Sequence, residues 1–426
     1  MKTPYSESLD LSVQRQIPGG FTVEANYVGR LGRHLLQSLD IAEPVDFVDT
    51  NGGGDYYHAG SQLSKLVDLN GGNPNAYVPK IPYFEDLFPW MANFDYQGES
   101  ATQAIYSDEW APFRSNLGAT SALADIDFYC FSGSLGVNYP CPANHVSRFW
   151  QDQFASLYTL STMGMSYYNA GQLILRHPTS YGLNLDFSYT FSNSIDMGSD
   201  AERGTEFNNN GGNFSNITNT WKPQLSRGHS DFDIRHLITA DWVYQIPVGR
   251  GRKYLGSDNA FTDALIGGWQ WSGINRWSSG LPFSLLEPGW TTDWQIGSYG
   301  VVNGPVKMQK HVLNGSPQVF ADPAAINAGT TTGGPVRLPY PGDAGERNNF
   351  RGDGIFGIDS GLAKTWKIKE YGGLQFSWQV FNVTNSVRFN TNGVYLGQGL
   401  TGGNLGSYSA MQNAPRRMQF GLRYDF

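Results

Sequence analysis

The sequence has no run of apolar residues long enough for a membrane-spanning helix, which needs roughly 20 of them. Charged residues are also scarce. They make up 15% of the 426 residues, whereas ordinary soluble domains have about 25%. The net charge of −8 argues against a nucleic-acid partner. These deficits exclude a helical membrane protein and a typical nucleic-acid-binding protein.

The sequence also has few cysteines and no recognisable catalytic motif. The two cysteines, Cys130 and Cys141, lie in one loop-like segment. In an oxidising compartment they would form a disulfide, and otherwise they would be two unpaired thiols. The sequence has no G-x-S-x-G motif, no phosphate-binding loop and no Cys–His pair. We therefore expect neither an enzyme nor a bound cofactor or metal.

Aromatic residues and glycine are abundant, at 14% and 52 residues respectively. The last stretch, RRMQFGLRYDF, shows how the aromatic residues are placed. Its apolar residues alternate strictly with polar ones: Met418, Phe420, Leu422, Tyr424 and Phe426. A period of two is that of a strand with one apolar and one polar face.

The same alternation predicts nine strands, near residues 6–17, 20–29, 165–176, 181–192, 234–247, 268–279, 355–367, 373–384 and 415–426. Strands of about 10–15 residues exceed the usual length in soluble proteins and suit a tilted membrane crossing. The connections near 18–19, 177–180 and 368–372 are short, and the one at 248–267 is moderate and basic. The others are long: about 30–164, 193–233, 280–354 and 385–414.

Short turns that alternate with long loops are typical of outer-membrane barrels. The pattern predicts an all-β, antiparallel transmembrane barrel segment whose long loops are extracellular. The first strand then runs toward the periplasm and the ninth ends there. Phe420, Leu422, Tyr424 and Phe426 would contact outer-membrane lipid and form the C-terminal signature that the barrel-assembly machinery is thought to recognise.

Seven stretches, in one order along the whole chain, resemble the C-terminal barrel of TonB-dependent outer-membrane receptors. The closest resemblance is to the Oar-like subgroup, whose members often carry a carboxypeptidase-regulatory-like domain. The stretches are EANYVGRLGRHLL, YYNAGQLILRHPTSYGLNLDFSYTFSNSID, SDFDIRHLITADWVYQIPVGRGRKY, LIGGWQWSGINRWSSGLPF, RNNFRGDGIFGIDSGLAKTWKI, GLQFSWQVFNVTNSVRFN and RRMQFGLRYDF.

This resemblance implies active uptake of a ligand, such as an oligosaccharide, peptide or chelate, powered through TonB. Barrels of this kind have about 22 strands and a plugged lumen, so about 13 strands, the plug and the TonB-contacting segment are missing. A signal peptide is also absent, since the residues after Met1 already alternate like a strand. We therefore expect residues 1–426 to be the C-terminal part of a longer receptor.

The first long connection, about 30–164, contains many aromatic residues beside Asn, Asp and Gln. Tyr83, Trp90, Tyr96 and Trp110 are possible ligand contacts, because rings provide a large contact area with few rotors to fix. The alternative is that the rings pack as the loop's own core. We favour packing for most of them, with a minority exposed to ligand.

Two short motifs that resemble functional sites are interpreted as structural features. The stretch GHSDFDIRH brings His229, Asp231, Asp233 and His236 together, as a metal site would, but no zinc-binding framework accompanies them. We interpret them as polar residues at the rim of the barrel. The Arg-Gly-Asp tripeptide within 350–354 resembles an adhesion motif, and we interpret it as a turn.

Two other functions stay open beside TonB-dependent uptake. One is a surface adhesin or structural barrel without TonB coupling. The other is an outer-membrane enzyme. A plug and a TonB-contacting segment upstream would select the receptor, whereas a catalytic cluster that converges in the folded chain would indicate the enzyme.

Overall fold

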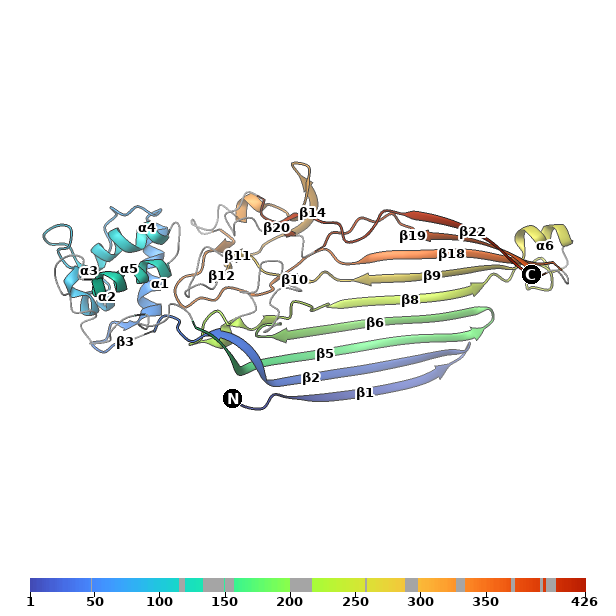
Figure 1. Ribbon diagram of the computed structural model, residues 1–426, viewed down its shortest axis with the longest axis horizontal. Helices are drawn as coiled ribbons and strands as arrows, with labels where there is room; N and C mark the ends of the chain where they lie inside the picture. The colour runs from blue at the N-terminus through green and yellow to red at the C-terminus, as the bar shows by residue number, and fades with distance from the viewer. Residues whose placement is uncertain are drawn as a thin grey trace.

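The computed structural model describes residues 1–46, 48–114, 119–132, 149, 157–199, 217–256, 259–287, 298–326, 334–368, 372–390, 394–395 and 404–426. Figure 1 shows a long sheet with a layer of helices, short strands and loops at one end. We call this the loop layer. No helix among the described residues is long and apolar enough to cross a membrane.

The main sheet follows chain order, β1-β2-β5-β6-β8-β9-β18-β19-β22, with β7 beside β6. The strands are β1 Tyr5–Ile17, β2 Phe21–Asp40, β5 Tyr158–Ser180, β6 Leu183–Asp196, β7 Gly228–His229, β8 His236–Gln245, β9 Trp269–Ser278, β18 Phe356–Lys367, β19 Gly373–Phe381 and β22 Arg417–Asp425. All neighbouring strands are antiparallel. The nine long strands are those that the sequence predicted, which confirms the all-β, antiparallel fold class.

Two strands are longer than predicted at the loop-layer end. β2 continues past residue 29 to Asp40, and β5 begins at Tyr158 instead of near 165. Their register shifts between Gly32 and Leu35 and again before Gln37. Such shifts break the alternation of faces, so the sequence pattern ends before the strand does.

The strand register gives the sheet two chemically different faces. One row of paired residues is apolar: Phe420, Trp378, Leu362, Trp271 and Tyr244. The adjacent row is mostly polar or small: Gln419, Gln379, Gly361 and Ser272. Because side chains alternate along each strand, these rows belong to opposite faces, which we call the apolar face and the polar face.

The last strand lies at an edge of the sheet, with Figure 1 placing the C-terminus at the end away from the loop layer. Phe420 stacks on Trp378 with ring centroids 6.1 Å apart. Phe420 and Leu422 nevertheless stay 66% and 70% exposed, and Tyr424 and Phe426 are exposed too. An apolar face this open needs an apolar surrounding.

The short turns lie at the end away from the loop layer, as does the one helix beside them, α6 Ala260–Ile266 (Figure 1). The described helices of the loop layer are α1 Tyr56–Leu69, α2 Pro82–Leu87, α3 Ala101–Ala104, α4 Ala111–Arg114 and α5 Ala119–Ser132, with the 3-10 turns η1 Pro89–Met91 and η4 Pro223–Ser226 and the π-helix η2 Ile105–Trp110. Its short strands are β3 Val48–Asp49, β4 Gly54–Asp55, β10 Pro282–Phe283, β11 Leu286–Glu287, β12 Ser298–Tyr299, β13 Val301–Val302, β14 Met308–Leu313, β15 Ser316–Phe320, β16 Val336–Arg337, β17 Phe350–Arg351, β20 Val394–Tyr395 and β21 Ser407–Tyr408.

Replacing Leu173 with arginine should lower the free energy of unfolding by about 2–4 kcal/mol in a bilayer, because it puts a charge on the lipid side of the wall. Leu173 pairs with Ala25 and Tyr189 on the apolar face. A denaturant titration of the membrane-embedded protein measures the change. Gln172→Arg, on the polar face, is the matched control and should cost far less. Equal effects would contradict the assignment of the two faces.

Candidate functional site

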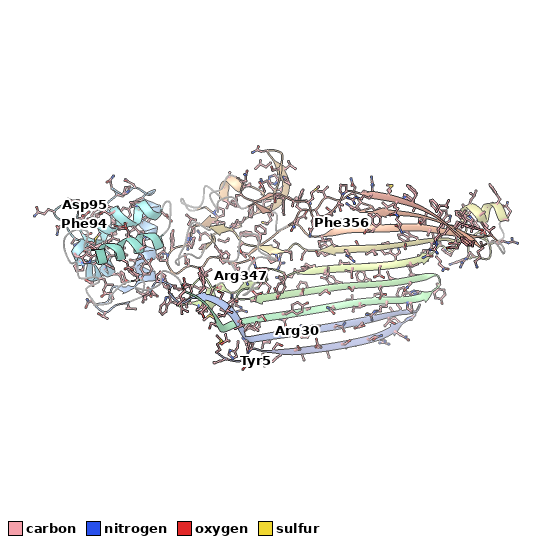
Figure 2. All side chains as sticks on the ribbon, in the orientation of Figure 1. Tyr5, Arg30, Phe94, Asp95, Arg347 and Phe356 are labelled. Carbon is pink, nitrogen blue, oxygen red and sulfur yellow. The ribbon has the colours of Figure 1, made fainter. Side chains whose placement is uncertain are left out.

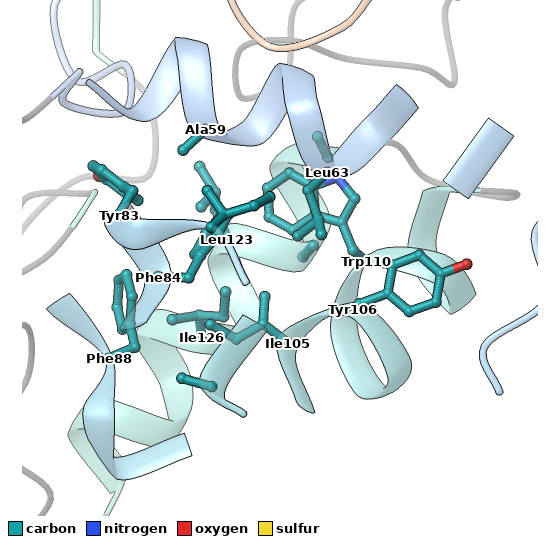
Figure 3. Close-up of a cluster of buried hydrophobic side chains, with 14 of the residues drawn as sticks. Ala59, Leu63, Tyr83, Phe84, Phe88, Ile105, Tyr106, Trp110, Leu123 and Ile126 are labelled. Atoms are coloured by element: carbon teal, nitrogen blue, oxygen red, sulfur yellow. The ribbon is translucent and has the colours of Figure 1, made fainter. Parts of the chain in front are cut away.

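The loop layer contains a helical unit, made of α1 to α5 with η1 and η2, that has a hydrophobic core of its own. Figure 3 shows this core, in which side chains from all parts of the unit meet. The largest of its fully buried side chains are Tyr56, Leu63, Tyr83, Phe84, Leu87, Phe88, Tyr106, Trp110 and Phe149. Trp110 belongs to this core, with its ring centroid 6.4 Å from that of Tyr56 and 6.0 Å from that of Phe84.

Local sequence explains why this long connection folds into helices. The side chain of Asp55 caps α1 by accepting a hydrogen bond from the His58 backbone N–H at 2.7 Å. Pro82 occupies the first position of α2, and Ser100 caps α3. The buried residues of α1 recur at helical spacing, which builds one apolar face: Tyr56, Ala59, Leu63 and Val67.

The four aromatic residues proposed as ligand contacts differ in their placement. Tyr83 and Trp110 have no exposed surface, and the Trp110 indole donates to the Ser64 hydroxyl at 2.9 Å. In this structure both rings therefore pack the core and offer no surface to a ligand, which corrects their selection. Trp90 is half-buried against the core, and Tyr96 is 56% exposed. For these two, ligand contact stays a prediction.

An acidic side chain of η2 is buried in the same helical unit. Glu109 is 1% exposed. Burial raises the pKa of Glu109 to about 9, and Asp125, which shares a hydrogen bond with it, adds to the rise. Glu109 is therefore protonated and neutral at pH 7 in the folded unit, which lets it lie in an apolar core.

The helical unit should lose stability as the pH rises from about 5 to about 9. The folded state keeps the Glu109 proton over this range, whereas the unfolded chain releases it near its ordinary pKa of 4.5. One retained proton gives a slope of at most about 1.4 kcal/mol per pH unit. Unfolding midpoints at several pH values, followed by helical circular dichroism, measure it. Glu109→Gln should flatten the dependence, whereas Glu7→Gln, on exposed β1, should not. An unchanged slope in Glu109→Gln would refute this assignment.

A second core joins the two later long connections. Three phenylalanines from β10, β15 and β17 meet with ring centroids 5.6–5.9 Å apart: Phe283, Phe320 and Phe350. Leu405 and Tyr408 of the last connection complete the cluster. The segments that were predicted as separate loops, 280–354 and 385–414, are thus packed together.

A buried ionic junction ties this second core to the main sheet, at the position that Figure 2 labels Arg347. The Arg347 guanidinium is 3% exposed and pairs with Asp196, at the end of β6, and with Asp231 at 3.0 Å. Burial by itself would lower the pKa of Arg347, but the two carboxylates outweigh it, so the pKa is raised and the charge is kept. Arg351 pairs in the same way with Asp233.

This junction accounts for the residues that had resembled a metal site. Asp231 and Asp233 bind the two arginines, His229 lies 3.2 Å from Asp233, and His236 bonds to the Tyr189 hydroxyl at 2.9 Å. Among the described residues, no group of three His, Cys, Asp or Glu side chains is arranged to hold a metal. Their interpretation as polar residues at the rim agrees with these contacts.

Arg347 and Arg351 lie in no motif that predicts a functional role from sequence alone. They occur in the stretch ERNNFRGDG before β18, which holds the Arg-Gly-Asp tripeptide. The tripeptide is engaged internally: Asp353 pairs with Lys310 at 2.8 Å and with Arg388 at 2.9 Å. The predicted turn is not observed, because Phe350–Arg351 form strand β17 and 352–355 follow it as an irregular segment, with the Asp353 side chain only 9% exposed.

The proposed disulfide cannot be placed, because the Cys130 side chain and the whole of Cys141 lie outside the described residues. Its formation stays a prediction. The C-terminal signature is placed: Phe420, Leu422 and Tyr424 lie on the apolar face of β22, and Phe426 follows the end of that strand.

The similarities to known proteins extend over nearly the whole chain. Among solved structures, the chain is similar to the outer membrane transporter YddB from Escherichia coli, with 9% identity, a TM-score of 0.34, and coverage of 99% of this chain and 32% of that one. It is also similar to FpvA of P. aeruginosa bound to heterologous pyoverdines, with 9% identity, a TM-score of 0.31, and coverage of 99% and 27%. The chain thus spans about a third or less of their length. No curated protein sequence matches it.

A family model described as an outer membrane beta barrel domain matches residues 1–419. The apolar face of the sheet is then the side that meets lipid, and the polar face is the side that meets the lumen. This assignment places the protein in the bacterial outer membrane, where the sheet forms part of a barrel wall. With nearly its full length matched, the chain belongs to the outer membrane β-barrel domain family.

Proposed function

We propose that the chain is the C-terminal wall and loop layer of an Oar-like, TonB-dependent receptor that takes up a ligand across the outer membrane. The main support is the asymmetry of the sheet. Long connections gather in one packed layer, while the other end has short turns (Figure 1). A layer with two cores of its own presents a fixed surface to the cell exterior, as a receptor needs.

The open edges of the sheet support a wall completed by further strands. β1 and β22 are the two ends of the strand order in the described sheet. Backbone groups left unpaired at such edges would each cost several kcal/mol in hydrocarbon. We propose that additional strands of the same receptor close the wall, to about 22 in all. A plug and a segment that contacts TonB would belong to that missing part, and the barrel-assembly machinery would recognise β22.

Uptake can be tested without knowing the ligand. Cells with and without the complete gene are grown in one medium, and the solutes that remain are compared by mass spectrometry, with and without a protonophore. A TonB-dependent receptor should deplete at least one solute, and only in energised cells that carry the gene. A surface adhesin or purely structural barrel would leave the medium unchanged. Depletion that persists with the protonophore would also contradict energised uptake.

A further inference from the structure

The polar face of the main sheet carries a cavity of about 820 Å³ near the loop-layer end. It is lined by residues of β9, β18, β19 and β22 and by the segment 413–415. The register places its wall residues on the polar face: Ile274 pairs with Asp359, and Phe381 pairs with Arg417. A volume of this size falls within the usual range for small-molecule sites.

Two arginine side chains of this cavity have no partner among the described residues. The guanidinium groups of Arg276 and Arg417, both in the cavity lining, form neither an ion pair nor a hydrogen bond in this part of the chain. Asp359, the one carboxylate among the described lining residues, already accepts a hydrogen bond from the Asn382 backbone N–H at 2.8 Å. The lining therefore keeps a net positive charge, which suits an oxyanion, because guanidinium groups bind carboxylate and phosphate with paired hydrogen bonds.

At this cavity, the pattern of polar residues on the polar face of the sheet is interrupted. Ile274 and Phe381 occupy positions where the alternation calls for polar residues, and they are 47% and 43% exposed. Ile355, just before β18, is 43% exposed and lines the cavity as well. Exposed apolar groups beside unpaired cations match a ligand that has an apolar body and an anionic group.

The backbone leaves room for such a ligand. Gly357, on β18, pairs with Arg276 of β9 and lines the cavity. A Cβ atom added to Gly357 would meet no other atom within 4 Å. A larger side chain at this position would therefore occupy the cavity without disturbing the sheet.

We propose that this cavity binds a small ligand that carries a carboxylate or phosphate on an apolar body, with Arg276 and Arg417 holding the anionic group. Ile274 and Phe381 contact its apolar part. The proposal rests on the uptake function and names the chemical class of the ligand. The site faces the lumen, so its anion comes from a dissolved solute and not from a lipid headgroup.

Titration calorimetry with phenyl phosphate tests the proposal on protein extracted from outer membranes in detergent and phosphate-free buffer. Arg276→Gln and Arg417→Gln should each weaken binding at least about tenfold, the loss expected when hydrogen bonds to a charged group are removed. Gly357→Leu should also weaken binding, because its side chain would project into the cavity beside Arg276. Benzyl alcohol, which has the ring without the charge, should not bind measurably.

Arg423→Gln is the matched control. Arg423 lies on the polar face of the same strand but outside the cavity, where it pairs with Asp425 at 2.7 Å, so its loss should leave binding unchanged. No binding to the wild-type protein, or equal binding to the arginine variants, would overturn the proposal. Binding that is as tight in Gly357→Leu as in the wild-type protein would place the anion elsewhere and would overturn it too. Solute uptake by cells is measured separately, so failure of this site leaves the uptake test standing.

Discussion

Replacing Arg347 with methionine is expected to lower the free energy of unfolding of the loop layer by about 3–5 kcal/mol. The guanidinium is buried and pairs with Asp196 and Asp231, so its removal leaves two buried carboxylates without their cation. An uncompensated buried charge costs more than the ion pair itself contributes. Pulse proteolysis in urea, on protein in native membranes, measures the stability of the layer.

Two variants separate this burial effect from simple loss of a positive charge. Arg337 pairs with Asp343 at 2.8 Å in a more exposed setting, so Arg337→Met should cost only about 1 kcal/mol or less. Adding Asp196→Asn and Asp231→Asn to Arg347→Met should recover part of the loss, because the orphaned charges are gone. A similar cost for Arg337→Met and Arg347→Met would refute the buried junction as the source.

Replacing Trp110 with alanine is expected to destabilise the helical unit by about 3–5 kcal/mol. The ring is fully buried between Tyr56 and Phe84, so a large cavity would be left. The variant also removes the donor that satisfies the buried Ser64 hydroxyl. Urea unfolding followed by helical circular dichroism measures the loss.

Tyr77→Ala is the matched control for the aromatic residues of this connection. Tyr77 is 85% exposed, so its removal should change the unfolding free energy by less than about 0.5 kcal/mol. If Trp110→Ala were as mild, the Trp110 ring would not be part of a core. The prediction that it contacts ligand would then be open again.

The strands were predictable because a wall between lipid and water imposes one rule on every residue. Leu183, Leu185 and Phe187 alternate with Asn184 and Asp186 in β6, and no distant contact is needed to read that pattern. The rule fails where the strands rise into the loop layer. There the strand register shifts at Gly32 and Leu35, so alternate residues no longer stay on the same face of the sheet.

The loop layer was harder to predict because its contacts join residues far apart in the chain. Asp55 before α1 was a readable cap signal, so part of the helical unit was within reach of sequence reasoning. The partners of Arg347 were not, because Asp196 and Asp231 are separated from it by 151 and 116 residues. Nothing local in the sequence marks which acidic side chains a given arginine will meet.

The sequence by itself determined that the chain makes nine two-faced strands, with long connections at one end and short turns at the other. Period-two alternation is enough for this, since it is a local consequence of strand geometry between two different environments. Only the tertiary structure decided that Trp110 packs a core, that Arg347 locks the second core to β6, and that Arg276 and Arg417 share a cavity. Those outcomes depend on which strands and loops become neighbours, and that is set by strand register and packing across the whole chain.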